Sequence, residues 1–158
     1  MCFDKTDFYF EKARKEYCAV SKKDVDSLTE DEEIEITRRA GNHIGFFLTW
    51  IIRKGFEGEL HQELPQALEE VRTGKLLGVD FFRRYCDGKF WDEDLCPEIL
   101  PFVVKYYDGG QYWTDYVEWV INDLCDLPLE FVGDWEDYLQ FEPVLDQAYQ
   151  DFQDYMEG

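Results

Sequence analysis

The sequence predicts a mainly α-helical, compact single domain over residues 1–158, with a buried central helix around residues 34–54 and one or two short strands. Three observations favour this fold class. Apolar residues recur at three- and four-residue steps in most segments, as they do on one face of a helix. They make up 45% of the chain, enough for one core at this length. No internal repeat and no proline- or serine-rich linker divides the chain.

The central helix has a start signal and a stop signal. Thr29 and Glu32 have the spacing of a capping box, which predicts that a helix begins there. Between residues 44 and 52, apolar side chains cover every side of this helix, so it should be buried all round. Gly55 follows two basic residues and predicts the end of the helix.

Shorter helices are expected on both sides of it. The apolar spacing predicts them over residues 7–17, 65–73, 79–85, 95–107, 112–124 and 135–155. Residues 8–10 are also compatible with the start of a strand. Two prolines predict a kink or a late start in the fourth of these helices. Asp87-Gly88 indicates a turn, and residues 127–132 are expected to form a short strand.

Negative charge gathers in the last third of the chain. The formal net charge is −20, and residues 106–158 hold 14 carboxylates but no lysine, arginine or histidine. Thirteen aromatic residues are interleaved with these carboxylates, whereas disordered acidic tails contain few aromatic residues. We therefore expect a folded acidic surface that attracts a positively charged partner. A purely solvated acidic face is the alternative.

The expected partner-binding residues combine these carboxylates with large aromatic side chains, which are frequent anchors in interfaces. They are Asp108, Tyr112, Asp115, Glu118, Asp134, Trp135, Glu136, Asp137, Glu142 and Asp146. Lysine at positions 134, 136 and 137 is expected to weaken binding more than folding, because an exposed charge contributes about 1 kcal/mol or less to stability. Direct nucleic-acid binding is not expected, since it requires a basic surface.

Cysteine usage and the terminal sequence indicate a cytoplasmic protein. The five cysteines are odd in number and widely spaced, which favours reduced, buried thiols over a disulfide framework. No basic region followed by an apolar stretch opens the chain, so no secretory signal is visible. The longest apolar run, residues 44–52, is shorter than the roughly 20 residues that span a bilayer. We expect no membrane contact.

No catalytic, metal or cofactor site is expected. His43 and His61 are the only histidines and no C-x-x-C pair accompanies them, so the spacing does not favour zinc. Residues 73–75 and 41–45 lack the full phosphate-loop and dinucleotide patterns, and close packing explains the two glycines of the second segment better. His43 is the one candidate catalytic base, and we expect it to be a hydrogen-bonded core residue.

Several short segments carry a family resemblance: residues 41–50 (GNHIGFFLTW), 78–82 (GVDFF), 86–89 (CDGK), 106–107 (YY), 115–116 (DY) and 134–138 (DWEDY). In this order they resemble a bacterial domain family of uncharacterised function that is similar to immunity proteins. Immunity proteins are encoded beside secreted bacterial toxins and block them in the producing cell. The chain departs from the family at its start, where Asp7-Phe8-Tyr9-Phe10 replaces a Tyr-Asp-Asp-Ala and Trp-His element. The resemblance implies no catalytic residue.

Charge and resemblance together predict an immunity protein that binds and neutralises a cognate toxin effector, a basic protein of nuclease type, through the acidic aromatic-rich surface. Such binding should weaken as salt rises. An adaptor or chaperone for a basic protein cargo is the alternative that uses the same surface. A hydrolase that uses His43 with a nearby carboxylate is a third hypothesis, and it would lose activity in a folded His43→Ala variant.

Overall fold

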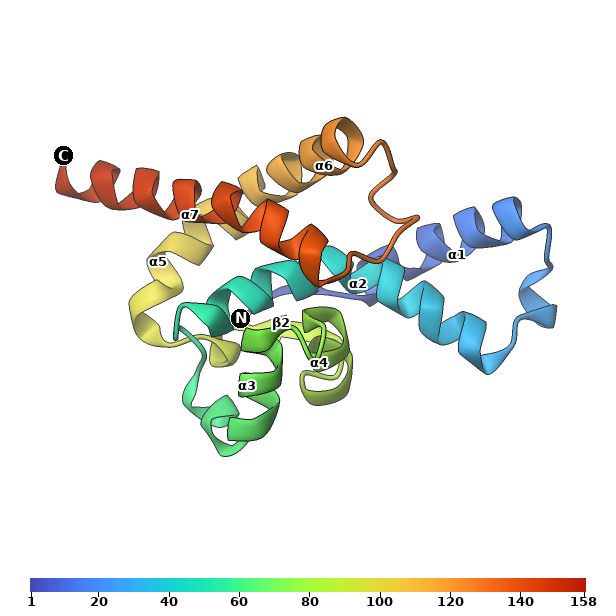
Figure 1. Cartoon of the computed structure of the whole chain (residues 1–158), viewed down its shortest axis with the longest axis horizontal. Helices are drawn as coiled ribbons and strands as arrows, with labels where there is room; N and C mark the ends of the chain where they lie inside the picture. The colour runs from blue at the N-terminus through green and yellow to red at the C-terminus, as the bar shows by residue number, and fades with distance from the viewer.

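Helix α2 (Glu30–Arg53) runs through the middle of the computed structural model, which describes residues 1–158 (Figure 1). A capping box holds its first turn: the Thr29 side chain accepts a hydrogen bond from the Glu32 N–H, and the Glu32 carboxylate accepts one from the Thr29 N–H. Gly55, with φ of +78°, turns the chain away after the helix. All residues from 40 to 52 are buried, which confirms the central core helix.

Six further α-helices surround α2 and confirm the mainly helical fold class. They are α1 (Asp7–Ser21), α3 (Pro65–Thr73), α4 (Gly78–Tyr85), α5 (Leu100–Val103), α6 (Gln111–Asp123) and α7 (Trp135–Glu157). Helix α5 starts late, after a 3₁₀ turn that begins at Pro97, and continues into a π-helical turn at Val104–Asp108. The proline pattern predicted this late start.

The only sheet has two short antiparallel strands, β1 (Cys2–Lys5) and β2 (Lys89–Trp91). Cys2 pairs with Trp91 and Lys5 with Lys89, and an irregularity in register lies between them. The sheet ties the start of the chain to the segment that follows α4. Residues 8–10, which are also compatible with a strand, belong to α1.

Residues 127–132 form turns and irregular backbone, so the strand predicted there is wrong. No strand lies alongside this segment to pair with it, because β1 and β2 pair only with each other. Leu129 is buried in a cluster with Ala13, Ile36 and Ala40. Burial of Leu129, stacking of Phe131 on Tyr116 and a hydrogen bond from the Gly133 N–H to Asn42 Oδ1 fix the connection between α6 and α7, and strand pairing does not.

Helices α2 and α4 touch through their backbones. A Cβ atom at Gly45 would lie 2.4 Å from the backbone nitrogen of Val79, and one at Gly78 would lie 2.1 Å from the carbonyl oxygen of Gly45. Both distances are too short for any side chain. The close packing inferred for Gly45 is therefore confirmed, and it fixes α4 against the central helix.

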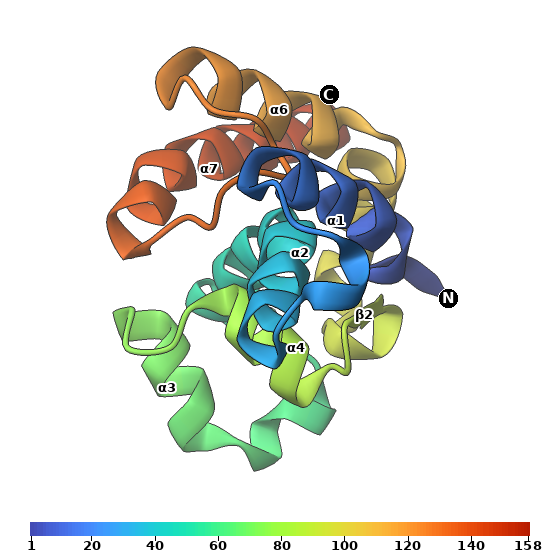
Figure 2. The same cartoon turned by 90° about the vertical axis from the view of Figure 1, so that its right-hand side faces the viewer.

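Four of the remaining helices form two pairs on opposite sides of α2. Helices α6 and α7 lie side by side on one side of it, and α3 and α4 lie on the other (Figure 2). Helix α7 runs antiparallel to α6, and its C-terminal turns extend past the start of α6 (Figure 1). None of the helices combines the length and the apolar character that a membrane crossing requires.

Candidate functional site

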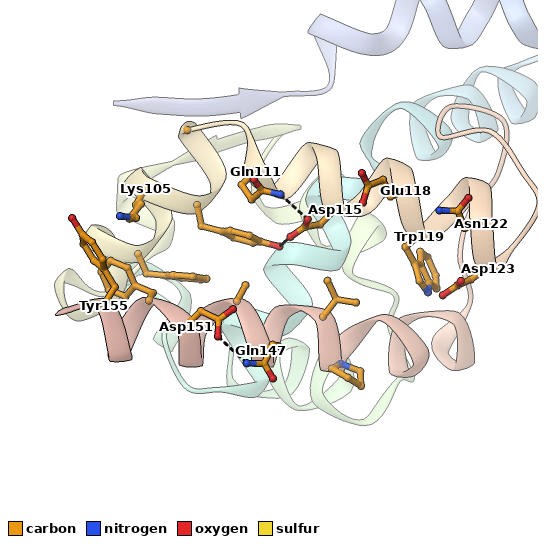
Figure 3. A pocket seen from close by; sticks show the side chains of 17 residues that line it. Lys105, Gln111, Asp115, Glu118, Trp119, Asn122, Asp123, Gln147, Asp151 and Tyr155 are labelled. Atoms are coloured by element: carbon orange, nitrogen blue, oxygen red, sulfur yellow. Dashed lines mark hydrogen bonds between the residues drawn. The ribbon is translucent and has the colours of Figure 1, made fainter. Parts of the chain in front are cut away.

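An open groove of about 1060 Å³ lies between α6 and α7. Below, "the groove" means this cavity (Figure 3). All its lining residues come from the segment between Phe102 and Tyr155, which is the acidic, aromatic-rich part of the chain. The groove is therefore built almost entirely from the region in which the sequence predicted a binding surface.

Aromatic side chains form the apolar part of the groove. Phe102 stacks on Tyr106 with ring centroids 5.1 Å apart, and Phe152 packs against Phe102 at 5.5 Å. Trp119, which is 6% exposed, lines the groove from α6. These rings belong to or pack against the main core cluster, so they form a rigid floor.

Four carboxylates line the groove: Asp115, Glu118, Asp123 and Asp151. The one lysine or arginine among the lining residues is Lys105, whose Nζ lies 3.5 Å from the centre of the Tyr155 ring. A lysine in that position is already engaged in a cation–π contact. The groove therefore keeps an excess of negative charge that a basic ligand could neutralise.

Hydrogen bonds orient two of these carboxylates. Asp115 accepts hydrogen bonds from the Tyr106 hydroxyl at 2.6 Å and from Gln111 Nε2 at 2.8 Å. Burial, together with the bond to Asp115, raises the pKa of Tyr106 well above its ordinary value, so the hydroxyl remains a donor. Asp151 accepts one bond from Gln147 at 2.8 Å. Figure 3 shows Asp115 and Asp151 reaching into the space between the two helices.

Of the ten predicted partner-binding residues, Asp115 and Glu118 line the groove. Asp108 is exposed at the end of the π-helical turn, outside the groove. Tyr112 is 1% exposed, and its hydroxyl donates to the carbonyl oxygen of His43. The structure therefore places Tyr112 in the core, on the side of α6 that faces α2.

Two further predicted residues form the N-terminal cap of α7. The Asp134 carboxylate accepts a hydrogen bond from the Asp137 N–H at 2.8 Å, and the Asp137 carboxylate accepts one from the Asp134 N–H at 3.0 Å. Lysine here would remove the cap and place positive charge at the positive end of the helix dipole. Lysine at these two positions should therefore also cost stability, whereas Glu136 is exposed beside them and caps nothing.

The last three predicted residues contact the end of α2. Glu142 binds Arg53 with a distance of 2.6 Å between carboxylate oxygen and Nε. Asp146 contacts Lys54 Nζ at 2.9 Å and accepts a hydrogen bond from the indole of Trp50. Trp135 stacks on Tyr138 beneath the Arg53 guanidinium. The cations missing from the acidic segment are thus supplied in part by α2.

His43 belongs to a buried polar network, as expected for a hydrogen-bonded core residue. It is 1% exposed, and its Nε2 lies 3.2 Å from Asp4 Oδ2. The hydroxyls of Tyr107 and Tyr9 donate to the same oxygen at 2.7 and 3.0 Å. Burial alone would raise the pKa of Asp4, but hydrogen bonds from His43, Tyr107 and the Lys5 N–H, with the charge of His43, lower it below its ordinary value.

A second cavity, of about 230 Å³, lies beside this network. No serine, threonine or cysteine lines it, so the ordinary hydroxyl or thiol nucleophiles are missing. Burial, followed by the charge of Asp4, raises the pKa of Tyr9 and of Tyr107, which keeps both hydroxyls protonated. The network holds β1, α1 and α2 together, and its groups are engaged with one another.

The cysteines are free, but none of them is buried, so the expectation of buried thiols is wrong. Cys2 and Cys125 are exposed, and Cys18, Cys86 and Cys96 are partly exposed. One of them approaches two other potential metal ligands: His61, Cys86 and Asp94 offer ligand atoms that all lie within 4.8 Å of one another. The spacing of these residues along the chain gave no sign of this cluster.

Sequence reasoning also missed part of the groove. Asp123, Asp151, Trp119 and Phe152 line it and were not among the predicted residues. The lining positions follow the three- and four-residue spacing of a helix face. They are 111, 115, 118, 119 and 122 on α6, and 144, 147, 148, 151, 152 and 155 on α7. The closeness of the two helix faces follows only from the antiparallel packing of α6 and α7.

A family model described as "Domain of unknown function (DUF7832)" matches residues 2–128. The matched span includes α6 and ends before α7, so it covers one wall of the groove. No curated protein and no solved structure matches the chain.

Proposed function

The chain belongs to the DUF7832 family of domains of unknown function, and we propose that it binds a positively charged segment of another protein in the groove between α6 and α7. One observation carries this proposal: four carboxylates line an open groove with an aromatic floor, and its one lysine is engaged with Tyr155. Opposite charge steers a basic partner to such a surface and fixes its register.

The shape of the groove favours a peptide segment over a small metabolite. Its volume of about 1060 Å³ is at the upper end of small-molecule sites, and it is open along two helices. An amphipathic helix laid in a groove presents anchors at three- and four-residue steps. Its lysines and arginines would lay their aliphatic stems over Phe102, Trp119 and Phe152 and place their charges against the carboxylates.

The more specific proposal is that the partner is a toxin effector and that the chain is its immunity protein. The resemblance in residues 41–50 and 134–138 supports it, as does the acidic groove, because a nuclease needs a basic surface to hold nucleic acid. Carboxylates on a groove can occupy that surface in place of phosphates. An adaptor or chaperone for a basic cargo would use the same groove without inhibiting an enzyme.

Binding is tested with a synthetic amphipathic peptide that carries leucine and arginine at helical spacing, and with an analogue in which glutamate replaces arginine. We expect the arginine peptide to bind, with an affinity that falls as salt rises, and the glutamate peptide not to bind. Tryptophan emission reports on it, because Trp119 lines the groove. Equal binding of both peptides, or binding indifferent to salt, would contradict the proposal.

A matched pair of triple variants separates local from overall charge. Glu118→Gln, Asp123→Asn and Asp151→Asn neutralise the groove, and Glu33→Gln, Glu63→Gln and Glu69→Gln neutralise three exposed residues elsewhere. Both variants change the net charge equally. We expect the first to weaken peptide binding about ten-fold, or about 1.4 kcal/mol, and the second to have little effect. Equal losses would mean that net charge alone attracts the peptide.

The immunity proposal predicts that a nuclease-type protein is encoded beside this chain in its host, and it is tested on that protein. The purified chain should inhibit nucleic-acid cleavage by that protein, and the groove-neutralised variant should inhibit it less. A complex that forms through the groove but leaves cleavage unchanged would support the adaptor or chaperone and remove the immunity proposal. A complex that excludes α6 and α7 would remove both.

A hydrolase that uses His43 is the second candidate, and one observation favours it: His43 and Asp4 form a buried pair beside the cavity of about 230 Å³. The chemistry would have to use a water, because the lining has no serine, threonine or cysteine. A hydrolytic activity of the purified chain that disappears in a folded His43→Ala variant would establish it.

A further inference from the structure

We propose that His61, Cys86 and Asp94 form a binding site for a zinc-type divalent transition-metal ion, independent of the acidic groove. The three residues come from the 3₁₀ turn Glu59–Glu63, from the C-cap of α4 and from the 3₁₀ turn Asp92–Asp94. An imidazole nitrogen, a thiolate sulfur and a carboxylate oxygen are the three ligand types that zinc accepts in proteins. Magnesium and calcium prefer oxygen ligands alone.

The distances suit one ion between the three groups. His61 Nε2 lies 3.9 Å from Cys86 Sγ and 2.8 Å from Asp94 Oδ1. Two ligands at zinc distances of about 2.1 and 2.3 Å, separated by a tetrahedral angle, are roughly 3.5 Å apart. The observed separations lie on either side of this value, so small side-chain rotations would complete the coordination.

The surrounding structure holds two of the ligands in place. Asp94 Oδ2 accepts a hydrogen bond from the Trp91 N–H at 2.7 Å, which leaves Oδ1 directed at His61. The imidazole of His61 packs edge-on against Phe81 with ring centroids 5.3 Å apart. Hydrogen-bonded ligands of this kind are typical of metal sites, because outer partners fix the orientation of the ligating atoms.

Burial and coordination number indicate an exchangeable ion. His61 and Asp94 are 1% and 5% exposed, whereas Cys86 is partly exposed as a residue, so the cluster lies just below the surface on the side of Cys86. Three protein ligands leave the fourth tetrahedral position to a water or an outside ligand. His61 Nδ1 has no hydrogen-bond partner, so the outer shell is incomplete and the affinity should be lower than that of a four-ligand structural site.

Binding would exchange a proton for the ion. Burial, together with the charge of Asp94, raises the pKa of the Cys86 thiol, so the free protein keeps this sulfur protonated. When the metal–sulfur bond forms, the S–H bond breaks and the proton leaves to solvent, while His61 ligates as the neutral imidazole. No change of oxidation state is involved.

The test uses the full-length protein, treated with chelator, and Co²⁺ or Zn²⁺ alone as the probe. We expect one Co²⁺ per chain with a thiolate-to-cobalt absorption band, and displacement of the band by Zn²⁺. Cys86→Ser should abolish the band and weaken metal binding at least ten-fold. Removing an outer-shell partner already lowers metal affinity by about ten-fold or more, and Cys86 would bind the metal directly. The control Cys18→Ser removes another partly exposed thiol and should change neither.

A second measurement needs no variant. Alkylation of each cysteine in the wild-type protein is followed by mass spectrometry, and Zn²⁺ should slow the modification of Cys86 while leaving Cys18 and Cys125 unaffected. An absence of stoichiometric binding at micromolar metal, a cobalt spectrum without a thiolate band, or equal protection of all cysteines would overturn the proposal. Neither measurement depends on peptide binding in the groove, so this site and the proposed function can fail separately.

Discussion

Carboxylates on the two sides of α2 lie in opposite surroundings. On the side of β1 and α4, Asp4 and Asp94 are 4% and 5% exposed, and each accepts hydrogen bonds from several groups. In the groove, Glu118 and Asp123 are exposed and make no hydrogen bond within the chain. A buried charge without partners would cost several kcal/mol, whereas an exposed one costs little. The first pair holds the fold together, and the second is available to a ligand.

The difference shows that the number of acidic residues in a segment is a poor measure of its available charge. The segment after Lys105 contains 14 carboxylates and no lysine, arginine or histidine. In the structure, Glu142 and Asp146 are paired with basic residues of α2. Two more carboxylates of the segment cap α7. Four of the other ten carboxylates line the groove, which gathers them between two helices.

The largest expected effect follows from removing a buried carboxylate. Asp4→Ala leaves His43, Tyr9 and Tyr107 without their shared acceptor in the core. Each buried donor left without a partner costs about 1–3 kcal/mol, so the free energy of unfolding should fall by about 3–5 kcal/mol in urea denaturation. Peptide binding in the groove, measured where the variant is folded, should be unchanged. A loss below about 1 kcal/mol would show that the network does not hold β1.

The pH dependence of that effect has a definite sign. Because the pKa of Asp4 is lowered in the folded protein, its ionised form contributes stability above the unfolded pKa of about 3.9. This contribution is lost as the pH falls through the folded value. The stability difference between wild type and Asp4→Asn should therefore be largest above about pH 4 and shrink below it. A constant difference across this range would contradict the assignment.

The next largest effect tests the close packing of α4 on α2. Gly45→Ala would place a Cβ atom 2.4 Å from the backbone of Val79, and such overpacking costs about 1–3 kcal/mol or more. Gly41→Ala is the matched control on the same helix, because its Cβ atom would meet its nearest neighbour at 3.4 Å. The control should be neutral or gain up to about 1 kcal/mol of helix propensity. Equal effects in thermal unfolding would show that the two helices can move apart.

A smaller effect is expected at the start of α7, one wall of the groove. Asp134→Ala removes the side chain that accepts the Asp137 N–H, which costs about 1 kcal/mol. Glu136→Gln, in the same first turn, removes a charge but no cap, so its cost should be smaller. Chemical denaturation of the two variants gives the comparison. Equal stability would mean that the capping box contributes nothing to α7.

The sequence predicted those features that depend on neighbouring residues. The capping box at Thr29, the stop at Gly55 and Pro65 at the first position of α3 each act within one or two turns, and the helices other than α5 lie where their apolar spacing placed them. A similar pattern at Asp134 and Asp137 has capping-box spacing and could have been recognised as a cap. These residues instead stood among the predicted partner-binding residues because only their charge was considered.

Features that depend on distant residues could not be predicted. β1 pairs with a strand more than 80 residues further along the chain, and neither strand has a sequence pattern long enough to show it. The His61, Cys86 and Asp94 cluster is assembled from three separate turns, whereas metal motifs are recognised by close spacing. The burial of Tyr112 follows from the direction in which α6 faces α2, which its apolar stripe alone does not fix.

The smallest expected effect on stability is in the groove, and it is the one that separates the two sides of α2 most clearly. Glu118→Gln, Asp123→Asn and Asp151→Asn remove three negative charges from the groove. Of the three carboxylates, only Asp151 accepts a hydrogen bond, which Gln147 donates. The free energy of unfolding should change by less than about 0.5 kcal/mol in ordinary buffer. At low salt it should rise slightly, because the chain carries a net charge of −20 and repels itself. Guanidinium would screen this repulsion, so urea is the appropriate denaturant. If the variant unfolds more easily instead, the groove carboxylates serve the fold as Asp4 does, and their role in binding loses its support.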